Sequence, residues 1–255
     1  MTGLLIVRRN NNQMKYLGFL FAVIFFSCQT PVEAQQLFVA GTQTAQKFEK
    51  TVPLNYLLYL PDNYDPERKE GYPTILFLHG AGERGDDVSV LTMWGPPKIA
   101  AEKGLPFIVI SPQCPKGHWW TSMMFPLKSL LDYSIETYNI DTSRIYLTGL
   151  SMGGYGTFAF SLLYPGYFAA VAPMCGGGTP SMVNFTKDYP PVWVFHGDAD
   201  KIVPISSSQI MVDKMKDAGY DVKFTVYKGG DHYMFQKAYR EEGLFDWFLE
   251  HKKGK

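Results

Sequence analysis

Short apolar runs alternate with helix-length segments along most of this chain, and this alternation restricts its fold more than any other feature. Continuous apolar runs of about five residues are typical of strands buried on both faces of a sheet. We expect strands at Val52–Leu60, Thr74–Leu78, Phe107–Ser111, Arg144–Thr148, Ala169–Pro173, Val192–Phe195 and Lys223–Tyr227. Apolar residues at three- and four-residue spacing predict helices at Pro126–Tyr138, Met152–Leu163, Ser206–Ala218 and Glu241–Glu250. The pattern predicts an α/β fold, with a mostly parallel central sheet and helices on both faces.

Residues 35–255 contain no internal repeat, low-complexity tract or long linker, so we predict a single domain there. The long predicted loops Gly80–Pro106 and Pro112–Pro126 follow strand ends, where such folds place their sites. The chain has 24 Lys+Arg against 24 Asp+Glu, which lacks the basic excess of a nucleic-acid-binding protein. We therefore expect no nucleic-acid partner.

Residues 1–34 differ from the rest and predict an export signal. Three basic residues precede the apolar run Leu17–Cys28, which is short for a bilayer span. Val32–Ala34 then supplies small residues suited to cleavage. We expect a periplasmic or secreted protein without an integral membrane span after processing. Lipid attachment at Cys28 is an alternative to this cleavage, and Met14 is an alternative start.

A pentapeptide of the form G-x-S-x-G, Gly149–Gly153, carries most of the functional signal. A predicted strand precedes it and a predicted helix follows it, which is the context of a nucleophile elbow. On such a turn Ser151 takes a strained backbone conformation that exposes its hydroxyl at the helix N-terminus. We predict that Ser151 is a catalytic nucleophile.

A serine nucleophile needs a base, which is commonly a histidine oriented by a carboxylate. His232 follows the last predicted strand, which is the position expected in the order Ser, Asp, His. His79 and His196 each end a strand in a His-Gly pair, where we expect them to brace loops. Asp200 is the preferred acid, and we expect the neighbouring Asp198 to cap the turn.

Two backbone N–H groups are expected to form an oxyanion hole. One belongs to Met152, directly after the serine, and the other to Ala81 in the glycine-rich turn after an early strand. The charged run Glu83–Asp87 is predicted to be a solvated salt-bridge cluster, with substrate contact as the alternative. Trp119 and Trp120 are candidate substrate-binding residues, because flat aromatic faces stack on sugar or phenolic rings.

Taken in order, these motifs resemble the α/β-hydrolase superfamily. They are His79–Gly82 (HGAG), Gly149–Gly154 (GLSMGG), His196–Pro204 (HGDADKIVP) and Gly229–His232 (GGDH). Within the superfamily the chain is similar to secreted bacterial esterases. These are the carbohydrate esterases of family one, polyhydroxybutyrate-depolymerase-like proteins and dienelactone-hydrolase-like proteins. Ser111–Pro115 and the nearby Trp pair are similar to members described as peptidases or phospholipase/carboxylesterases.

The resemblance implies an α/β-hydrolase fold and a serine esterase that works without a metal or cofactor. Its implied substrates are small esters or acylated plant polysaccharides, from which it would remove acetyl or feruloyl groups. A prolyl-oligopeptidase-like serine peptidase and a non-catalytic glycan-binding homologue are the alternatives. Cys114 and Cys175 follow strand ends, and the sequence leaves open whether they form a disulfide.

Overall fold

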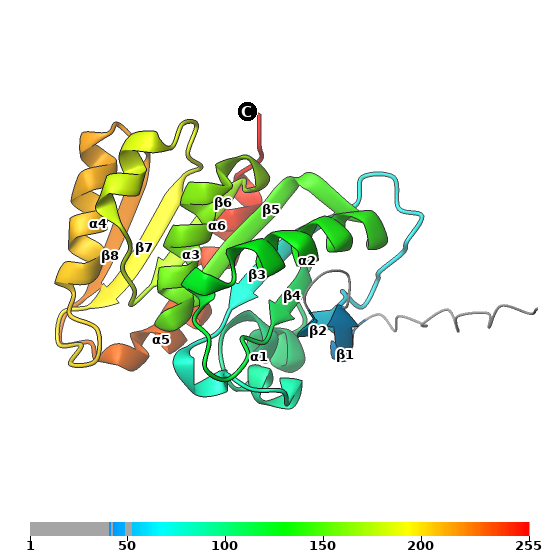
Figure 1. Ribbon diagram of the computed structural model, residues 1–255. Coiled ribbons are helices and arrows are strands. Elements are labelled where there is room, and N and C mark those ends of the chain that lie inside the picture. The colour runs from blue at the N-terminus through cyan, green and yellow to red at the C-terminus, as the bar shows by residue number, and fades with distance from the viewer. Residues whose placement is uncertain (1–40, 42, 49–52, 255) are drawn as a thin grey trace, which may run out of the picture. The chain divides into compact units, whose positions relative to one another are not determined.

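The computed structural model describes residues 41, 43–48 and 53–254, which belong to one compact unit. The predicted export signal, residues 1–34, lies outside the described residues. Eight strands form one sheet in the order β1-β2-β4-β3-β5-β6-β7-β8 (Figure 1). The strands are β1 (Gln43–Phe48), β2 (Leu54–Tyr59), β3 (Tyr72–Leu78), β4 (Ile108–Pro112), β5 (Ile140–Leu150), β6 (Ala170–Met174), β7 (Val192–Gly197) and β8 (Val222–Tyr227).

The sheet is mostly parallel, as predicted. β3 pairs in parallel with β4 and β5, and the parallel pairing continues through β6, β7 and β8. β2 pairs antiparallel with β1 and with β4. The helices are α1 (Gly95–Lys103), α2 (Met124–Thr137), α3 (Met152–Leu163), α4 (Ser206–Asp217), α5 (Phe235–Glu241) and α6 (Leu244–Glu250).

The helices cover both faces of the sheet (Figure 1). Alternate residues of a strand point to opposite faces, so β3 contributes Leu76 and Leu78 to one apolar core and Ile75 and Phe77 to the other. The first core lies under α2, α3 and α4, and the second lies under α1, α5 and α6. This two-sided burial explains why the central strands read as continuous apolar runs.

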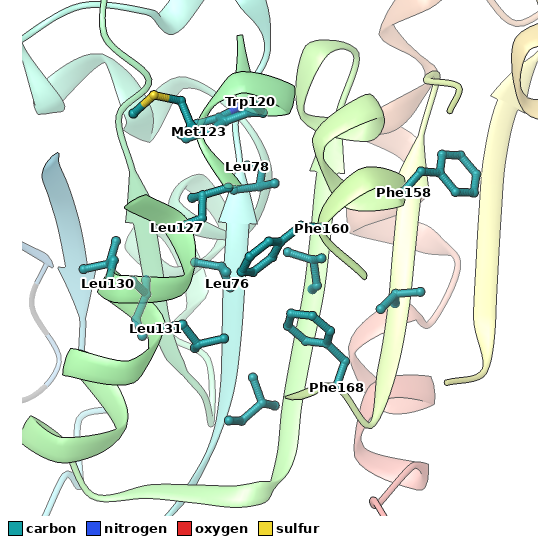
Figure 2. Close-up of a cluster of buried hydrophobic side chains, with 14 of the residues drawn as sticks. Leu76, Leu78, Trp120, Met123, Leu127, Leu130, Leu131, Phe158, Phe160 and Phe168 are labelled. Carbon is teal, nitrogen blue, oxygen red and sulfur yellow. The ribbon is translucent and has the colours of Figure 1, made fainter. Parts of the chain in front are cut away.

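The first core fixes the helix that follows the predicted nucleophile. Figure 2 shows Leu76 and Leu78 of β3 beside Leu127 of α2 and Phe160 of α3. All four side chains are fully buried. Full burial of a Leu or Phe side chain stabilises the fold by about 1.5–3 kcal/mol. This core therefore packs α3 against β3.

All seven predicted strands are confirmed, whereas three other elements differ from expectation. β1 was missed because Gln43–Phe48 carries only two apolar residues and pairs on one edge alone. α1 lies inside the predicted loop Gly80–Pro106, because its Pro-Pro pair occupies a first turn that needs no proline N–H. The predicted helix Glu241–Glu250 begins only at Leu244, after Gly243 with φ 68°.

Within the part of the chain that is described, no helix is both long and apolar enough to cross a membrane.

Candidate active site

Ser151 lies at the sharp turn between β5 and α3. Its backbone has φ 55° and ψ −118°, and such a conformation costs about 1–3 kcal/mol. A Cβ on Gly153 would lie 1.8 Å from the Leu78 carbonyl oxygen, and one on Gly149 would lie 2.5 Å from the Gly153 oxygen. Glycine at both positions therefore allows α3 to approach β3 closely enough to hold the strained turn.

His232 begins the 3-10 helix η6 (His232–Met234), a short loop beyond β8. Its Nδ1 donates a hydrogen bond of 2.7 Å to Oδ2 of Asp200. A carboxylate can only accept, so the ring proton lies on Nδ1 and Nε2 is left as the basic nitrogen. This is the tautomer that a general base requires.

Asp200 lies beyond the end of β7 and is 8% exposed. Its Oδ1 accepts hydrogen bonds from the amides of Ile202 at 2.8 Å and Val203 at 2.9 Å. Burial acts to raise the pKa of the Asp200 carboxyl, but the bonds from His232 and the two amides outweigh it and hold the pKa below its ordinary value. Asp200 is thus an ionised partner for His232 at neutral pH.

Cys175, directly after β6, lies beside the His–Asp pair. Its Sγ lies within 4.8 Å of a side-chain ligand atom of both Asp200 and His232. The Ser151 amide donates a hydrogen bond of 2.9 Å to the oxygen of Met174, the residue before Cys175. The end of β6 therefore contacts the backbone of the elbow through Met174 and the His–Asp pair through Cys175. The place of Cys175 after a strand end was visible in the sequence, but its contact with the pair was not.

Cys175, Asp200 and His232 are also a group that could hold a metal ion by spacing alone. A thiol must be deprotonated to bind a metal, and burial raises the pKa of Cys175. The 2.7 Å hydrogen bond already pairs the carboxylate with the imidazole. A protonated thiol and an already paired carboxylate make this group a poor metal site. Cys114 and Cys175 are both buried free thiols.

The other residues singled out on these loops have structural partners. Asp198 is exposed and accepts the Gly229 amide at 2.6 Å, which ties the β7 turn to the loop before His232. His79 is buried, with Nδ1 2.6 Å from the Gly80 oxygen and Nε2 accepting the Cys114 amide at 2.9 Å. Burial lowers the pKa of His79 to about 4, so the ring is neutral.

The two predicted oxyanion donors lie at the same edge of the sheet. Leu78 at the end of β3 is in register with Gly149 of β5, so the loop after β3 reaches the elbow. Ala81 begins the 3-10 helix η1 (Ala81–Glu83), and Met152 is the first residue of α3. The first N–H groups of a helix have no partner within it, which leaves them for a ligand.

Glu83 corrects the prediction that the run Glu83–Asp87 is wholly solvated. Glu83 is 9% exposed, its Oε2 lies 3.9 Å from Nδ1 of the buried His79, and its backbone oxygen accepts a hydrogen bond of 2.9 Å from the Gln113 side chain. Burial raises the pKa of its carboxyl. Arg84 donates from Nε to the Ala81 oxygen at 3.0 Å. These contacts fix the η1 loop from two sides.

The prediction that Trp120 contacts substrate is wrong. Trp120 is fully buried, its Nε1 donates to the His79 oxygen at 2.9 Å, and it packs with the first core (Figure 2). Trp119 is 51% exposed, and the Arg84 guanidinium lies 5.3 Å from its ring centroid. One tryptophan is thus an anchor, whereas the other remains available to a ligand.

Tyr233 is an aromatic residue that sequence reasoning missed. It follows His232 directly, is 51% exposed, and its ring centroid lies 6.1 Å from that of His232. The ring centroid of Trp94 lies 6.3 Å from that of Tyr233. Its position next to the predicted base was the available signal.

The sheet order, the elbow and the hydrogen-bonded histidine–aspartate pair define an α/β-hydrolase. Residues 121–246 match the dienelactone hydrolase family. The chain therefore has an α/β-hydrolase fold, and residues 121–246 are similar to dienelactone hydrolases, as the resemblance of its motifs implied.

Relatives and solved structures agree with this class. The chain is 31% identical over 150 residues to a bifunctional acetylxylan esterase/xylanase of Neocallimastix patriciarum, covering 54% of this chain and 20% of that protein. It is 29% identical over 156 residues to feruloyl esterase B of Neurospora crassa, covering 53% and 51%. A crystal structure of a thermostable esterase superposes with a TM-score of 0.71 at 32% identity, covering 83% of this chain and 63% of that one. The chain thus spans less than two thirds of each.

Proposed function

We propose that this chain is a serine carboxylic ester hydrolase in which Ser151 is the nucleophile, His232 the base and Asp200 the orienting acid. The observation that carries the proposal is the 2.7 Å bond from His232 Nδ1 to Asp200, beside the strained elbow of Ser151. The esterase names of its relatives support the same reaction class.

In this mechanism Nε2 of His232 takes the proton from Ser151 as its Oγ bonds to the ester carbonyl carbon. The carbonyl oxygen becomes an oxyanion held by the amides of Met152 and Ala81, and each such donor is worth about 3–4 kcal/mol. Collapse expels the alcohol, which takes the proton from His232 and leaves an acyl-enzyme. Water then gives a proton to Nε2 and attacks the acyl carbon, which releases the acid and restores Ser151.

The proposed substrates are acetyl or feruloyl esters of plant polysaccharides, or related small esters. Two relatives are named as an acetylxylan esterase and a feruloyl esterase, which supports this class. The exposed ring of Trp119 offers a flat face to a sugar or phenolic ring.

Replacement of the nucleophile tests the reaction class. We expect Ser151→Ala to lower the hydrolysis of p-nitrophenyl acetate by about 10³-fold or more, with an unchanged circular dichroism spectrum. Wild-type hydrolysis by the folded variant would refute the proposal. Labelling of Ser151 by a fluorophosphonate would separate a catalyst from a non-catalytic homologue.

A panel of acetylated xylan, methyl ferulate and proline-containing peptides tests the substrate class. We expect release of acetate or ferulate and no peptide cleavage. Cleavage of the peptides alone would instead indicate a serine peptidase.

We also propose that the protein is exported, on the strength of the basic and apolar N-terminal pattern. The test is N-terminal sequencing after expression of the full chain in a bacterial host. We expect a mature protein that begins at Gln35. A lipid on Cys28 would indicate anchoring, and an intact N-terminus would contradict export.

A further inference from the structure

We propose that a second histidine, His196, is a positioning residue for the triad, because its buried ring holds the same carboxylate oxygen that His232 uses. The inference rests on the proposed function and concerns how Asp200 is kept in place. From the sequence, His196 was expected only to brace a loop.

His196 lies near the end of β7 and is 0% exposed. Its Nε2 lies 2.9 Å from the Val203 carbonyl oxygen and 3.3 Å from Oδ2 of Asp200. Both of those oxygens can only accept, so Nε2 carries a proton directed at the pair. The Nε2 proton is thus donated to the Val203 oxygen and also lies close to Oδ2 of Asp200.

Ser208 of α4 fixes the orientation of this ring. Its Oγ lies 2.7 Å from Nδ1 of His196 and 2.7 Å from the Gly176 carbonyl oxygen. Because the neutral ring carries its proton on Nε2, Nδ1 accepts the hydrogen bond of the Ser208 hydroxyl, which fixes the plane of the ring. Because Ser208 is fully buried, water cannot replace this contact.

Three hydrogen bonds and one further N–H thus surround the Asp200 carboxylate. The amides of Ile202 and Val203 donate to Oδ1 and His232 donates to Oδ2 at 2.7 Å, while Nε2 of His196 lies 3.3 Å from Oδ2. Contacts on both oxygens restrict rotation of the carboxylate. The longer contact to His196 keeps Oδ2 aimed at His232 without displacing the stronger bond.

The contact also affects how basic His232 is. An N–H directed at Oδ2 shares the negative charge that stabilises the protonated form of His232. The titratable side chains that face His232 are Asp200, the buried thiol Cys175 and Tyr233, with His196 next to the carboxylate. Exposed charges on the same loops belong to Asp198, Lys201, Lys228 and Asp231. Loss of the His196 N–H should therefore make His232 more basic.

A matched pair of variants tests this role. His196→Gln keeps an N–H near the position of Nε2, whereas His196→Met has a side chain of the same length without a donor. We expect His196→Met to lower kcat for p-nitrophenyl acetate by about 10- to 100-fold with little change in KM. We also expect the acid limb of its pH profile of kcat/KM to move to higher pH. His196→Gln should restore much of the wild-type kcat and bring the acid limb back toward its wild-type position.

Ser208→Ala gives a second test, with Ser161→Ala as its control. Ser161 is an equally buried hydroxyl, but it hydrogen bonds to Tyr189. We expect Ser208→Ala to lower kcat and move the acid limb in the same direction, and Ser161→Ala to leave the limb in place.

Two results would overturn the inference. One is a folded His196→Met enzyme with the wild-type kcat and acid limb, and the other is equal loss in the Met and Gln variants with an unmoved limb. If neither variant folds, an unmoved limb in Ser208→Ala overturns it. Failure of the proposed function is distinct, because Ser151→Ala would then keep wild-type hydrolysis.

Discussion

A single added methyl group on Gly153 should disrupt the elbow. A Cβ there would lie 1.8 Å from the Leu78 carbonyl oxygen, 2.5 Å from the Leu78 carbonyl carbon and 2.8 Å from the His79 oxygen. All three neighbours are backbone atoms of β3 or of the loop after it. Side-chain rotation therefore cannot relieve the contact, and either α3 or the end of β3 must move.

The size of the effect follows from this geometry. Real Cβ atoms essentially never approach another heavy atom closer than 3.0 Å, so the shortest contact must open by at least 1.2 Å. Overpacking of a rigid site costs about 1–3 kcal/mol and sometimes more, so we expect Gly153→Ala to lose about 3 kcal/mol of stability. For a chain of this size that loss lowers Tm by about 6–12 °C.

Thermal unfolding followed by circular dichroism measures this loss, with Gly166→Ala as the matched control. Gly166 is exposed and its added Cβ would meet nothing within 4 Å, so its Tm should stay near the wild-type value. Hydrolysis by Gly153→Ala should fall as well, because Ser151 moves with α3. A Tm for Gly153→Ala equal to that of Gly166→Ala would refute the reasoning.

Three further predictions concern other described residues. Asp200→Asn should lower kcat by about 10⁴-fold through loss of the correct tautomer of His232; steady-state kinetics test it, and a loss below 10-fold contradicts it. Burial lowers the pKa of His79 to about 4, so its neutral form stabilises the fold fully above pH 6.5 and this stability is lost as the pH falls toward 4. Urea unfolding should show that the free energy of unfolding falls by about 3 kcal/mol between pH 6.5 and 4. In His79→Gln the free energy of unfolding should depend less on pH, and an equal pH dependence in the two proteins would contradict the reasoning. Trp120→Leu should cost about 3 kcal/mol and Trp119→Ala less than about 1 kcal/mol, so equal losses in urea unfolding would contradict the assigned burial.

Features that depend on residues close together in the chain were predictable from the sequence. The central strands read as apolar runs because both of their faces are covered, and the glycines around Ser151 mark a turn that other residues cannot form. β1 and α1 were missed because their local composition is that of a loop. β1 pairs with β2 at the edge of the sheet, and its own sequence does not announce that pairing.

Some residues of the candidate site were likewise predictable from the sequence, whereas others were not. Chain order and residue chemistry indicated Ser151, Asp200 and His232 before any contact was known. They could not separate Trp119 from Trp120, because adjacent residues differ here only in which one faces α3. A Cβ on Gly156 of that helix would lie 2.6 Å from Cβ of Trp120, which shows how closely the two pack.

By itself, the sequence determined the class of fold, the elbow and the identity of the residues around it. Only the tertiary structure decided that His196 and His232 meet on one oxygen of Asp200. The two histidines are 36 residues apart in the chain. They meet because β7 and β8 pair in parallel, which brings the ends of both strands to the same edge of the sheet. Local residue patterns encode hydrophobicity and turns, but the contact between such distant residues depends on the register of the strands that carry them.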